Sequence, residues 1–245
     1  MIHVRELNSH YDNNHILKDV SFDVPKGTVT TIIGPSGSGK TSLLRTLNAL
    51  KLPSSGEIEI NNFVFNASSK ITKKDVTQLR DHSSMVFQNY NLFKNKTVLE
   101  NVTEGLIYGQ NMEKQQAIDT ALPHLEQVGL IAHKDKYPAQ LSGGQSQRVG
   151  IVRALALHKK ILLLDEPTSS LDVESIKSIL ELIKSIAKQG ITMVLVTHEI
   201  QFAKQISDQI LFIDDGQIIE RGTPQAVLEE SQSPRVKKFL NQINE

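Results

Sequence analysis

One stretch of this chain has a residue spacing that is suited to binding phosphate. Residues 34–41 read Gly-Pro-Ser-Gly-Ser-Gly-Lys-Thr and match the pattern G-x-x-x-x-G-K-[ST] at every fixed position. Glycines let backbone N–H groups approach an anion, Lys40 can reach the β- and γ-phosphates, and the Thr41 hydroxyl can ligate Mg²⁺. The spacing therefore predicts a nucleoside triphosphate site made by Gly34, Pro35, Ser36, Gly37, Ser38, Gly39, Lys40, Thr41 and the following Ser42.

Two adjacent carboxylates form a second group of side chains that could take part in catalysis. Asp165 and Glu166 directly follow the apolar run 161–164, which is typical of a buried strand. An aspartate at a strand end can hold Mg²⁺, and a neighbouring glutamate can polarise an attacking water. Gln88, after the apolar residues 85–87, could contact Mg²⁺ or that water, although a lone glutamine is also typical of a solvated loop. His198 follows a further apolar run at 191–196 in the same way.

Tyr11 is the candidate for contact with a nucleotide base. It precedes the phosphate-binding stretch in a polar segment, and Ile16 follows at a short interval. The ring could stack on a purine with Ile16 beside it; the alternative is a half-buried tyrosine at a strand edge.

Periodicity indicates the elements that must position these groups. Residues 28–33 are rich in β-branched side chains, and Leu43, Leu44, Leu47 and Leu50 recur at helical spacing, so the glycines form a strand-to-helix turn. Such a turn directs backbone N–H groups and the positive end of a helix at one point. Alternation in 2–7, 20–24 and 58–60 predicts antiparallel strands. The polar stretch from Asn66 to Lys74 predicts a surface loop.

Between Gln88 and the second apolar run, the sequence changes to helices and loops. Thr97 and Glu100 have capping-box spacing, and a second helix is expected from Glu113 to Val128, interrupted by Pro123. We therefore expect one domain, residues 1–245, in which a helical subdomain of about residues 89–157 is inserted.

Composition excludes several functions. Lys plus Arg and Asp plus Glu are equal at 27 each, so no global field attracts nucleic acid, and no nucleic-acid partner is expected. Cysteine is absent, which excludes disulfides and thiolate metal sites. No apolar run approaches the roughly 20 residues of a membrane span. The N-terminus lacks a signal-peptide core, so we expect a cytosolic chain that can dock on a membrane partner.

Leu141-Ser142-Gly143-Gly144-Gln145, between the phosphate-binding stretch and the carboxylates, is a very specific motif. With it, the chain resembles the ATP-binding subunits of ABC transporters over essentially its whole length. The resemblance implies an α/β fold: a P-loop NTPase (RecA-like) core with an antiparallel β subdomain and an inserted α-helical subdomain. It makes residues 34–41 the Walker A motif, 141–145 the signature and 161–166 the Walker B motif.

The same resemblance assigns roles to single residues and implies a dimer. Tyr11 becomes the adenine-stacking aromatic, Gln88 the Q-loop residue, Ser170 to Asp172 the D-loop, and His198 the switch histidine at the γ-phosphate. Two ATP molecules would lie in a head-to-tail homodimer, each between Lys40 of one copy and Ser142 and Gly144 of the other. Mg²⁺ would lie near Thr41, Gln88 and Asp165.

Further segments look like the bacterial polar amino acid importers of the arginine, histidine and glutamine type. They are 85–88, 91–93, 97–102, 197–199, 202–203 and 233–240. Departures occur at Lys94-Asn95, Ser146, Gly150 and Val173. The resemblance implies integral membrane permease subunits, indirectly a solute-binding protein, and a peripheral location at the cytoplasmic face of the inner membrane.

Other classes fit the motifs less well. A P-loop kinase or GTPase lacks the signature, a translation ABC ATPase carries two cassettes in one chain, and a chromosome-maintenance ATPase has a long coiled coil before the signature. An ATPase of a lipoprotein-release-type exporter is the main alternative, because its cassette is also short and separate.

Overall fold

The computed structural model describes residues 1–244 and contains two β-sheets, confirming the expected α/β architecture. The smaller sheet is antiparallel, in the order β2-β1-β4-β5, and consists of β1 (Ile2–Tyr11), β2 (Asn14–Val24), β4 (Ser55–Ile60) and β5 (Phe63–Asn66). The predicted alternation is confirmed, since Ile2, Val4 and Leu7 of β1 are buried and Val4 pairs with Phe22 of β2. One face of this sheet therefore covers the core.

The larger sheet brings the predicted chemistry to one edge. Its order is β10-β9-β3-β8-β7-β6, built from β3 (Val29–Ile33), β6 (Ser83–Val86), β7 (Ile161–Asp165), β8 (Thr192–Val196), β9 (Gln209–Asp214) and β10 (Gln217–Gly222). All neighbouring strands are parallel except the edge pair β9 and β10. Because parallel strands end at the same edge, the residues that follow β3, β6, β7 and β8 gather there.

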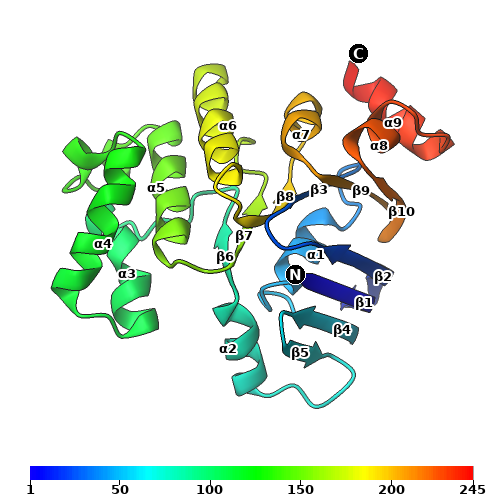
Figure 1. The fold of residues 1–245 in the computed structure, drawn as a ribbon, viewed down its shortest axis with the longest axis horizontal. Coiled ribbons are helices and arrows are strands. Elements are labelled where there is room, and N and C mark those ends of the chain that lie inside the picture. Colours follow the sequence, from blue (N-terminus) through cyan, green and yellow to red (C-terminus); the bar gives the residue numbers. More distant parts are fainter. Residues whose placement is uncertain (245) are drawn as a thin grey trace.

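Helices cover both faces of the larger sheet (Figure 1). On one side, α1 (Lys40–Thr46) packs with the antiparallel sheet; on the other lies α6 (Val173–Ala187). Alternate residues of β7 serve the two cores, Ile161 and Leu163 on one side and Leu162 and Leu164 on the other. The continuous apolar run at 161–164 is thus explained by burial on both faces.

The remaining helices of the core lie near the C-terminus and before β6. They are α7 (Ile200–Ile206), α8 (Pro224–Leu228) and α9 (Pro234–Asn244), together with α2 (Lys73–Asp81). Within residues 1–244, no helix has the length and apolar character that crossing a membrane would require.

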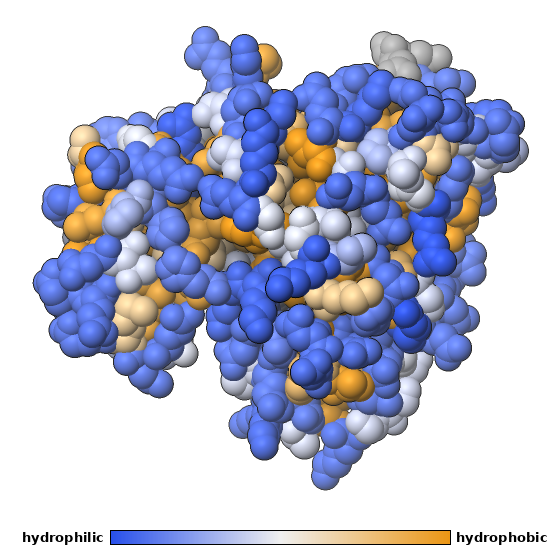
Figure 2. All heavy atoms as spheres, viewed as in Figure 1, coloured by the Kyte–Doolittle hydropathy of each residue, from blue (hydrophilic) through white to orange (hydrophobic). Residues whose placement is uncertain are grey.

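A separate group of helices follows β6 and precedes β7 in the chain, and it is shown in green at the left of Figure 1. It comprises α3 (Val98–Glu104), the π-helix η1 (Gly105–Gly109), α4 (Lys114–Gln127), the short 3₁₀ turns η2 (Ile131–His133) and η3 (Pro138–Gln140), and α5 (Gly143–Ala156). This helical lobe has its own apolar core, in which Val102, Leu125 and Val149 are fully buried. Figure 2 shows a hollow between the lobe and the rest of the molecule, with apolar residues exposed along it.

The structure corrects several local expectations. Pro123 does not interrupt α4, because burial of Ala117, Ala121 and Leu125 against the lobe outweighs the local cost of a proline. The expected loop from Asn66 to Lys74 is wrong at both ends: Asn66 closes β5, and α2 begins at Lys73 behind a capping box formed by Thr72 and Asp75.

The helix after the phosphate-binding stretch is also shorter than its leucine spacing suggests. It ends at Thr46, and Leu50 lies beyond it with 46% of its surface exposed. Tyr11 is the last residue of β1, but it is 66% exposed and not half-buried as the strand-edge alternative proposed.

Candidate functional site

The phosphate-binding stretch connects β3 to α1 and makes a tight backbone cradle. Gly34 has φ +148°, and a Cβ there would lie 2.0 Å from the Ile213 carbonyl oxygen, so only glycine fits. Gly39 has φ +103° and precedes the first residue of α1. The predicted strand-turn-helix arrangement is confirmed, and it leaves the first N–H groups of α1 facing the turn.

Lys40 lies inside this cradle. Its Nζ donates hydrogen bonds to the carbonyl oxygens of Gly34 at 2.9 Å and Pro35 at 2.8 Å. Burial lowers the pKa of Lys40, although the nearby carboxylates of Glu166 and Asp165 oppose that effect. A buried cation without an ion-pair partner among the described residues is well placed to meet an anion.

Two further features of the cradle fit a phosphate group. The Ser38 hydroxyl is buried and has no hydrogen-bond partner among residues 1–244, which is costly unless a ligand supplies one. At Gly37, no atom of the described residues other than Gly37 and its two chain neighbours lies within 4 Å of the position that a Cβ would take, so the loop is open there. These observations agree with the predicted contact of residues 34–42 with phosphates.

Asp165 ends β7 with its side chain fully buried. Its Oδ1 accepts a hydrogen bond from the Thr41 hydroxyl at 2.8 Å, and its Oδ2 accepts one from Arg45 at 3.3 Å. Burial raises the pKa of Asp165, an effect that these two donors oppose. One carboxylate beside one hydroxyl, next to a phosphate cradle, is a donor set that suits Mg²⁺, which prefers few protein oxygens and keeps phosphate or water ligands.

The Glu166 carboxylate lies within hydrogen-bond distance of side chains from two other segments. His198 Nε2 lies 3.1 Å from its Oε1, and Gln88 Nε2 donates to its Oε2 at 3.3 Å. The hydrogen bond from His198 is the main reason that the pKa of Glu166 is lowered. The carboxylate is therefore ionised at neutral pH and can accept a proton.

The backbone at Glu166 is also unusual. Its φ is +45°, in the left-handed region that non-glycine residues seldom adopt, and its N–H donates to the Val196 carbonyl oxygen at 3.0 Å. That hydrogen bond ties the residue after β7 to the end of β8, and so brings Glu166 next to His198.

Tyr11 and Ile16 lie on the hairpin of β1 and β2 beside the cradle. The Tyr11 ring is 66% exposed, with Lys51 Nζ at 5.8 Å from its centroid. Ile16 is half-buried, and its carbonyl oxygen would lie 3.1 Å from a Cβ at Gly39. The ring is thus accessible to a ligand, and the hairpin touches the phosphate cradle.

The signature residues lie elsewhere, at the start of α5. The Ser142 side chain accepts from the Gln145 N–H, and the Gln145 side chain accepts from the Ser142 N–H, in a capping box. A Cβ at Gly144 would lie 2.5 Å from Ser175 Oγ at the start of α6, and Asp172 caps that helix. Within residues 1–244, no hydrogen bond or ion pair joins 142–145 to 34–42, so one chain does not bring these two predicted parts together.

Three contacts at the site were not predicted from the sequence. Arg45 reaches Asp165, which its position four residues after Thr41 on α1 could have indicated. Tyr90 donates to the Ser170 carbonyl oxygen at 3.1 Å. His133 lies 3.2 Å from the Gln145 amide nitrogen, and no local pattern signals that contact.

Comparisons with known proteins agree with this geometry. The family model described as "ABC transporter" matches residues 17–169. The chain is 47% identical to the L-cystine import ATP-binding protein TcyC of Bacillus subtilis, over 99% of this chain and 98% of that protein. It is 43% identical to the glutamine transport ATP-binding protein GlnQ of Geobacillus stearothermophilus, over 99% of each.

Solved structures show the same likeness. A dimeric structure of MJ0796, a bacterial ABC transporter cassette, is 33% identical and superposes with a TM-score of 0.82, covering 91% of this chain and 99% of that one. A post-hydrolysis dimer of MJ0796 bound to ADP and Pi gives a TM-score of 0.81 over the same shares.

Proposed function

Because the chain belongs to the ABC transporter family of ATP-binding proteins, we propose that it is the ATP-hydrolysing subunit of an amino acid importer. The observation that carries the proposal is the convergence of His198 and Gln88 on Glu166, beside a phosphate cradle that contains Lys40. Relatives that are 42 to 48% identical over nearly the whole chain carry names that state cystine import, glutamine transport or arginine transport.

Each group has a distinct role in the proposed hydrolysis. Residues 34–42 hold the phosphates of ATP, and Lys40 neutralises their charge. Thr41, Asp165 and Gln88 hold Mg²⁺, which supplies charge stabilisation when bound. Glu166 accepts a proton from the attacking water, and His198 orients Glu166 and approaches the γ-phosphate. Tyr11 stacks on the adenine, with Ile16 packing beside it.

The proposal requires a second copy of the chain. The N-terminus of α5, formed by Ser142 as its cap and by Gly143, Gly144 and Gln145 as its first residues, is suited to an anion. Within residues 1–244, however, no hydrogen bond or ion pair joins it to the cradle. A head-to-tail homodimer, supported by the dimeric MJ0796 structures, would place the signature and Asp172 of one copy over the ATP held by the other.

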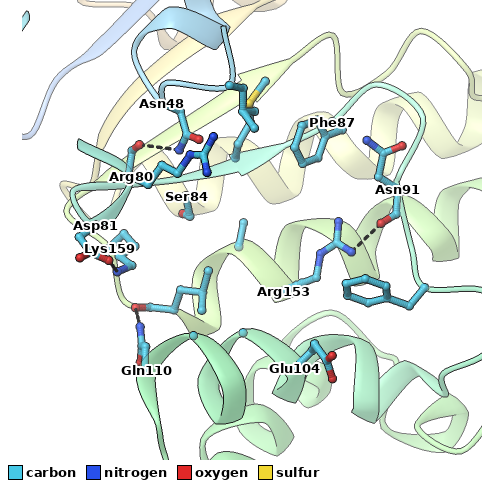
Figure 3. Close-up of a pocket in the computed structure, with 18 residues that line it drawn as sticks. Asn48, Arg80, Asp81, Ser84, Phe87, Asn91, Glu104, Gln110, Arg153 and Lys159 are labelled. Carbon is cyan, nitrogen blue, oxygen red and sulfur yellow. Dashed lines mark hydrogen bonds and ion pairs between the residues drawn. The ribbon is translucent and has the colours of Figure 1, made fainter. Parts of the chain in front are cut away.

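We further propose that membrane permease subunits bind the groove between the helical lobe and the core. The groove has a volume of about 590 Å³ and is lined by β6, α2, α3 and α5 (Figure 3). Apolar residues Met85, Phe87 and Leu157 line it, while the charged Arg80, Asp81, Glu104, Arg153 and Lys159 surround them. Apolar surface with a charged rim fits a short helical segment of a protein partner, which would hold this chain at the cytoplasmic face of the membrane.

Reconstitution tests the transport role. The chain, with the permease subunits encoded beside it, is placed in lipid vesicles, and phosphate release is measured with binding protein loaded with cystine, glutamine, arginine or histidine. We expect one of these loaded proteins to accelerate hydrolysis, because a loaded partner that favours the closed dimer raises turnover. A complex containing Glu166→Gln is the control for contaminating ATPases.

The result that overturns importer function is equally specific. If no polar amino acid accelerates hydrolysis but a lipoprotein or a lipid does, the chain serves an exporter. If the complex hydrolyses no ATP with Mg²⁺ under any condition, the catalytic assignment itself is wrong.

A further inference from the structure

The hydroxyl of Tyr90 joins three segments of the proposed ATPase. It donates to the Ser170 carbonyl oxygen in the D-loop at 3.1 Å, and it lies where a Cβ at Gly143 of the signature would come within 2.9 Å. Tyr90 itself follows Gln88 by two residues. One phenol therefore contacts the D-loop and the signature from the segment that begins at Gln88.

The backbone that presents this phenol is strained and held in place. Tyr90 has φ +59° and Asn91 has φ +49°, so two successive non-glycine residues lie in the left-handed region. Arg153 of α5 donates to the Tyr90 carbonyl oxygen at 2.9 Å and to the Asn91 carbonyl oxygen at 2.7 Å. Such strain persists only where surrounding contacts over-determine it, and it gathers at functional sites.

Two of the residues in these hydrogen bonds, Asn91 and Arg153, face the groove. Asn91 and Arg153 line it, and Figure 3 shows the hydrogen bond between them at its wall. In the part of the chain that the structure describes, Tyr90 to Ser170 is the single side-chain hydrogen bond between residues 88–96 and 169–172. A change in the groove can thus reach the D-loop through Asn91, Tyr90 and Ser170.

The interface around Tyr90 also has unused hydrogen-bonding capacity. Gln147 of α5 lies three residues from Gly150 and four from Gly143, both of which neighbour Tyr90, so it occupies the same helix face. Its side chain is fully buried, and in the part of the chain that the structure describes neither its oxygen nor its nitrogen has a hydrogen-bond partner. A buried amide without partners carries a desolvation cost, which a rearrangement that pairs it would relieve.

We propose that Tyr90 is a positioning residue: its hydroxyl holds the D-loop and the signature in the arrangement that meets the second copy, and it links that arrangement to the groove. The inference rests on the proposed function for the dimer, but the contact itself lies within one chain. Tyr90 touches no nucleotide phosphate in this scheme. Its loss should therefore weaken closure of the dimer and leave ATP binding by a single chain unchanged.

Tyr90→Phe tests the proposal, since it removes only the hydroxyl. It is made in a Glu166→Gln background, so that ATP is not consumed, and association is followed by sedimentation as ATP is added. Because one hydrogen bond is lost, we expect the dimer dissociation constant to rise about three- to tenfold. The affinity of the monomer for a fluorescent ATP analogue should stay within about twofold. Tyr108→Phe is the matched control, because that ring is 74% exposed and its hydroxyl makes no hydrogen bond in residues 1–244.

A second measurement separates failure of this inference from failure of the dimer. Hydrogen exchange of the amides at 169–172 in the single chain should be faster in Tyr90→Phe than in Tyr108→Phe. If Glu166→Gln forms no dimer with ATP, the dimer proposal fails and the exchange result decides the role of Tyr90. The inference is overturned if Tyr90→Phe leaves hydrogen exchange at 169–172 unchanged. It is also overturned if Glu166→Gln forms a dimer with ATP and adding Tyr90→Phe does not change the dissociation constant of that dimer.

Discussion

Replacing Glu166 by glutamine removes one proton acceptor with little change in shape. The carboxylate lies 3.1 Å from His198 Nε2 and 3.3 Å from Gln88 Nε2. An amide keeps one acceptor oxygen, so one of these two hydrogen bonds can persist, but its nitrogen cannot take a proton from water. We expect Glu166→Gln to bind ATP, to accumulate as an ATP-bound dimer, and to lose hydrolysis.

The size of the rate loss follows from the chemistry of the group. A positioned general base contributes about 10²- to 10⁴-fold, which corresponds to about 2.7 to 5.4 kcal/mol of barrier. The hydrogen bond from His198 lowers the pKa of Glu166, so the carboxylate is ionised at pH 7 and its full contribution is present.

The cost to folding should be smaller than the cost to catalysis. One hydrogen bond to a charged group contributes about 1.5 to 3 kcal/mol. His198 is 43% exposed, so water competes for it, and the loss should lie at or below the lower end of that range. A folded, ATP-binding and inactive variant is therefore the expected product.

Three measurements check the prediction. Phosphate release at saturating Mg²⁺ and ATP gives the rate, a fluorescent ATP analogue gives affinity, and size-exclusion chromatography gives the dimer. Glu199→Gln is the control, since it removes a carboxylate beside His198 that makes no hydrogen bond to Glu166. Hydrolysis by Glu166→Gln near the wild-type rate, or an equal loss in Glu199→Gln, refutes the reasoning.

The other predictions concern the base, the cradle and acid stability. Tyr11→Ala should weaken ATP affinity by about 1 to 3 kcal/mol, the range for one lost base stack, in a fluorescence titration; an unchanged dissociation constant makes Tyr11 a surface residue. Gly34→Ala should lower the urea midpoint far more than Gly37→Ala, because only the former Cβ meets backbone, at 2.0 Å; equal midpoints contradict this. The pKa of Glu166 is lowered from 4.5, so its stabilising effect is full above that pH and is lost as the pH falls through the lowered pKa. In His198→Ala this acid-dependent loss of unfolding free energy should shrink, and an unchanged pH profile shows that the contact is absent in solution.

The sequence by itself determined the parts of the site that short-range physics controls. A β-branched run, glycines at fixed offsets and a leucine repeat specify a strand-turn-helix, and the structure has it at Gly34. The apolar run at 161–164 followed by two carboxylates specifies a buried strand with Asp165 and Glu166 at its end, and the structure has that strand as β7. Such elements are readable because their backbone geometry depends on neighbours within a few residues.

Local patterns failed where distant packing competed with them. The helix-breaking signal of Pro123 was outweighed by burial of the other face of α4. The polar stretch before α2 carried a capping box, Thr72 with Asp75, that outweighs its lack of apolar period.

Only the tertiary structure decided which chemical groups meet. Gln88 and Glu166 are 78 residues apart in the chain, and Tyr90 and Ser170 are 80 apart, yet each pair shares a hydrogen bond. Their meeting depends on the strand order of the larger sheet, in which β6, β7 and β8 are adjacent. Strand order is a property of the packed whole, set by how layers bury their apolar faces, and no spacing within one segment encodes it.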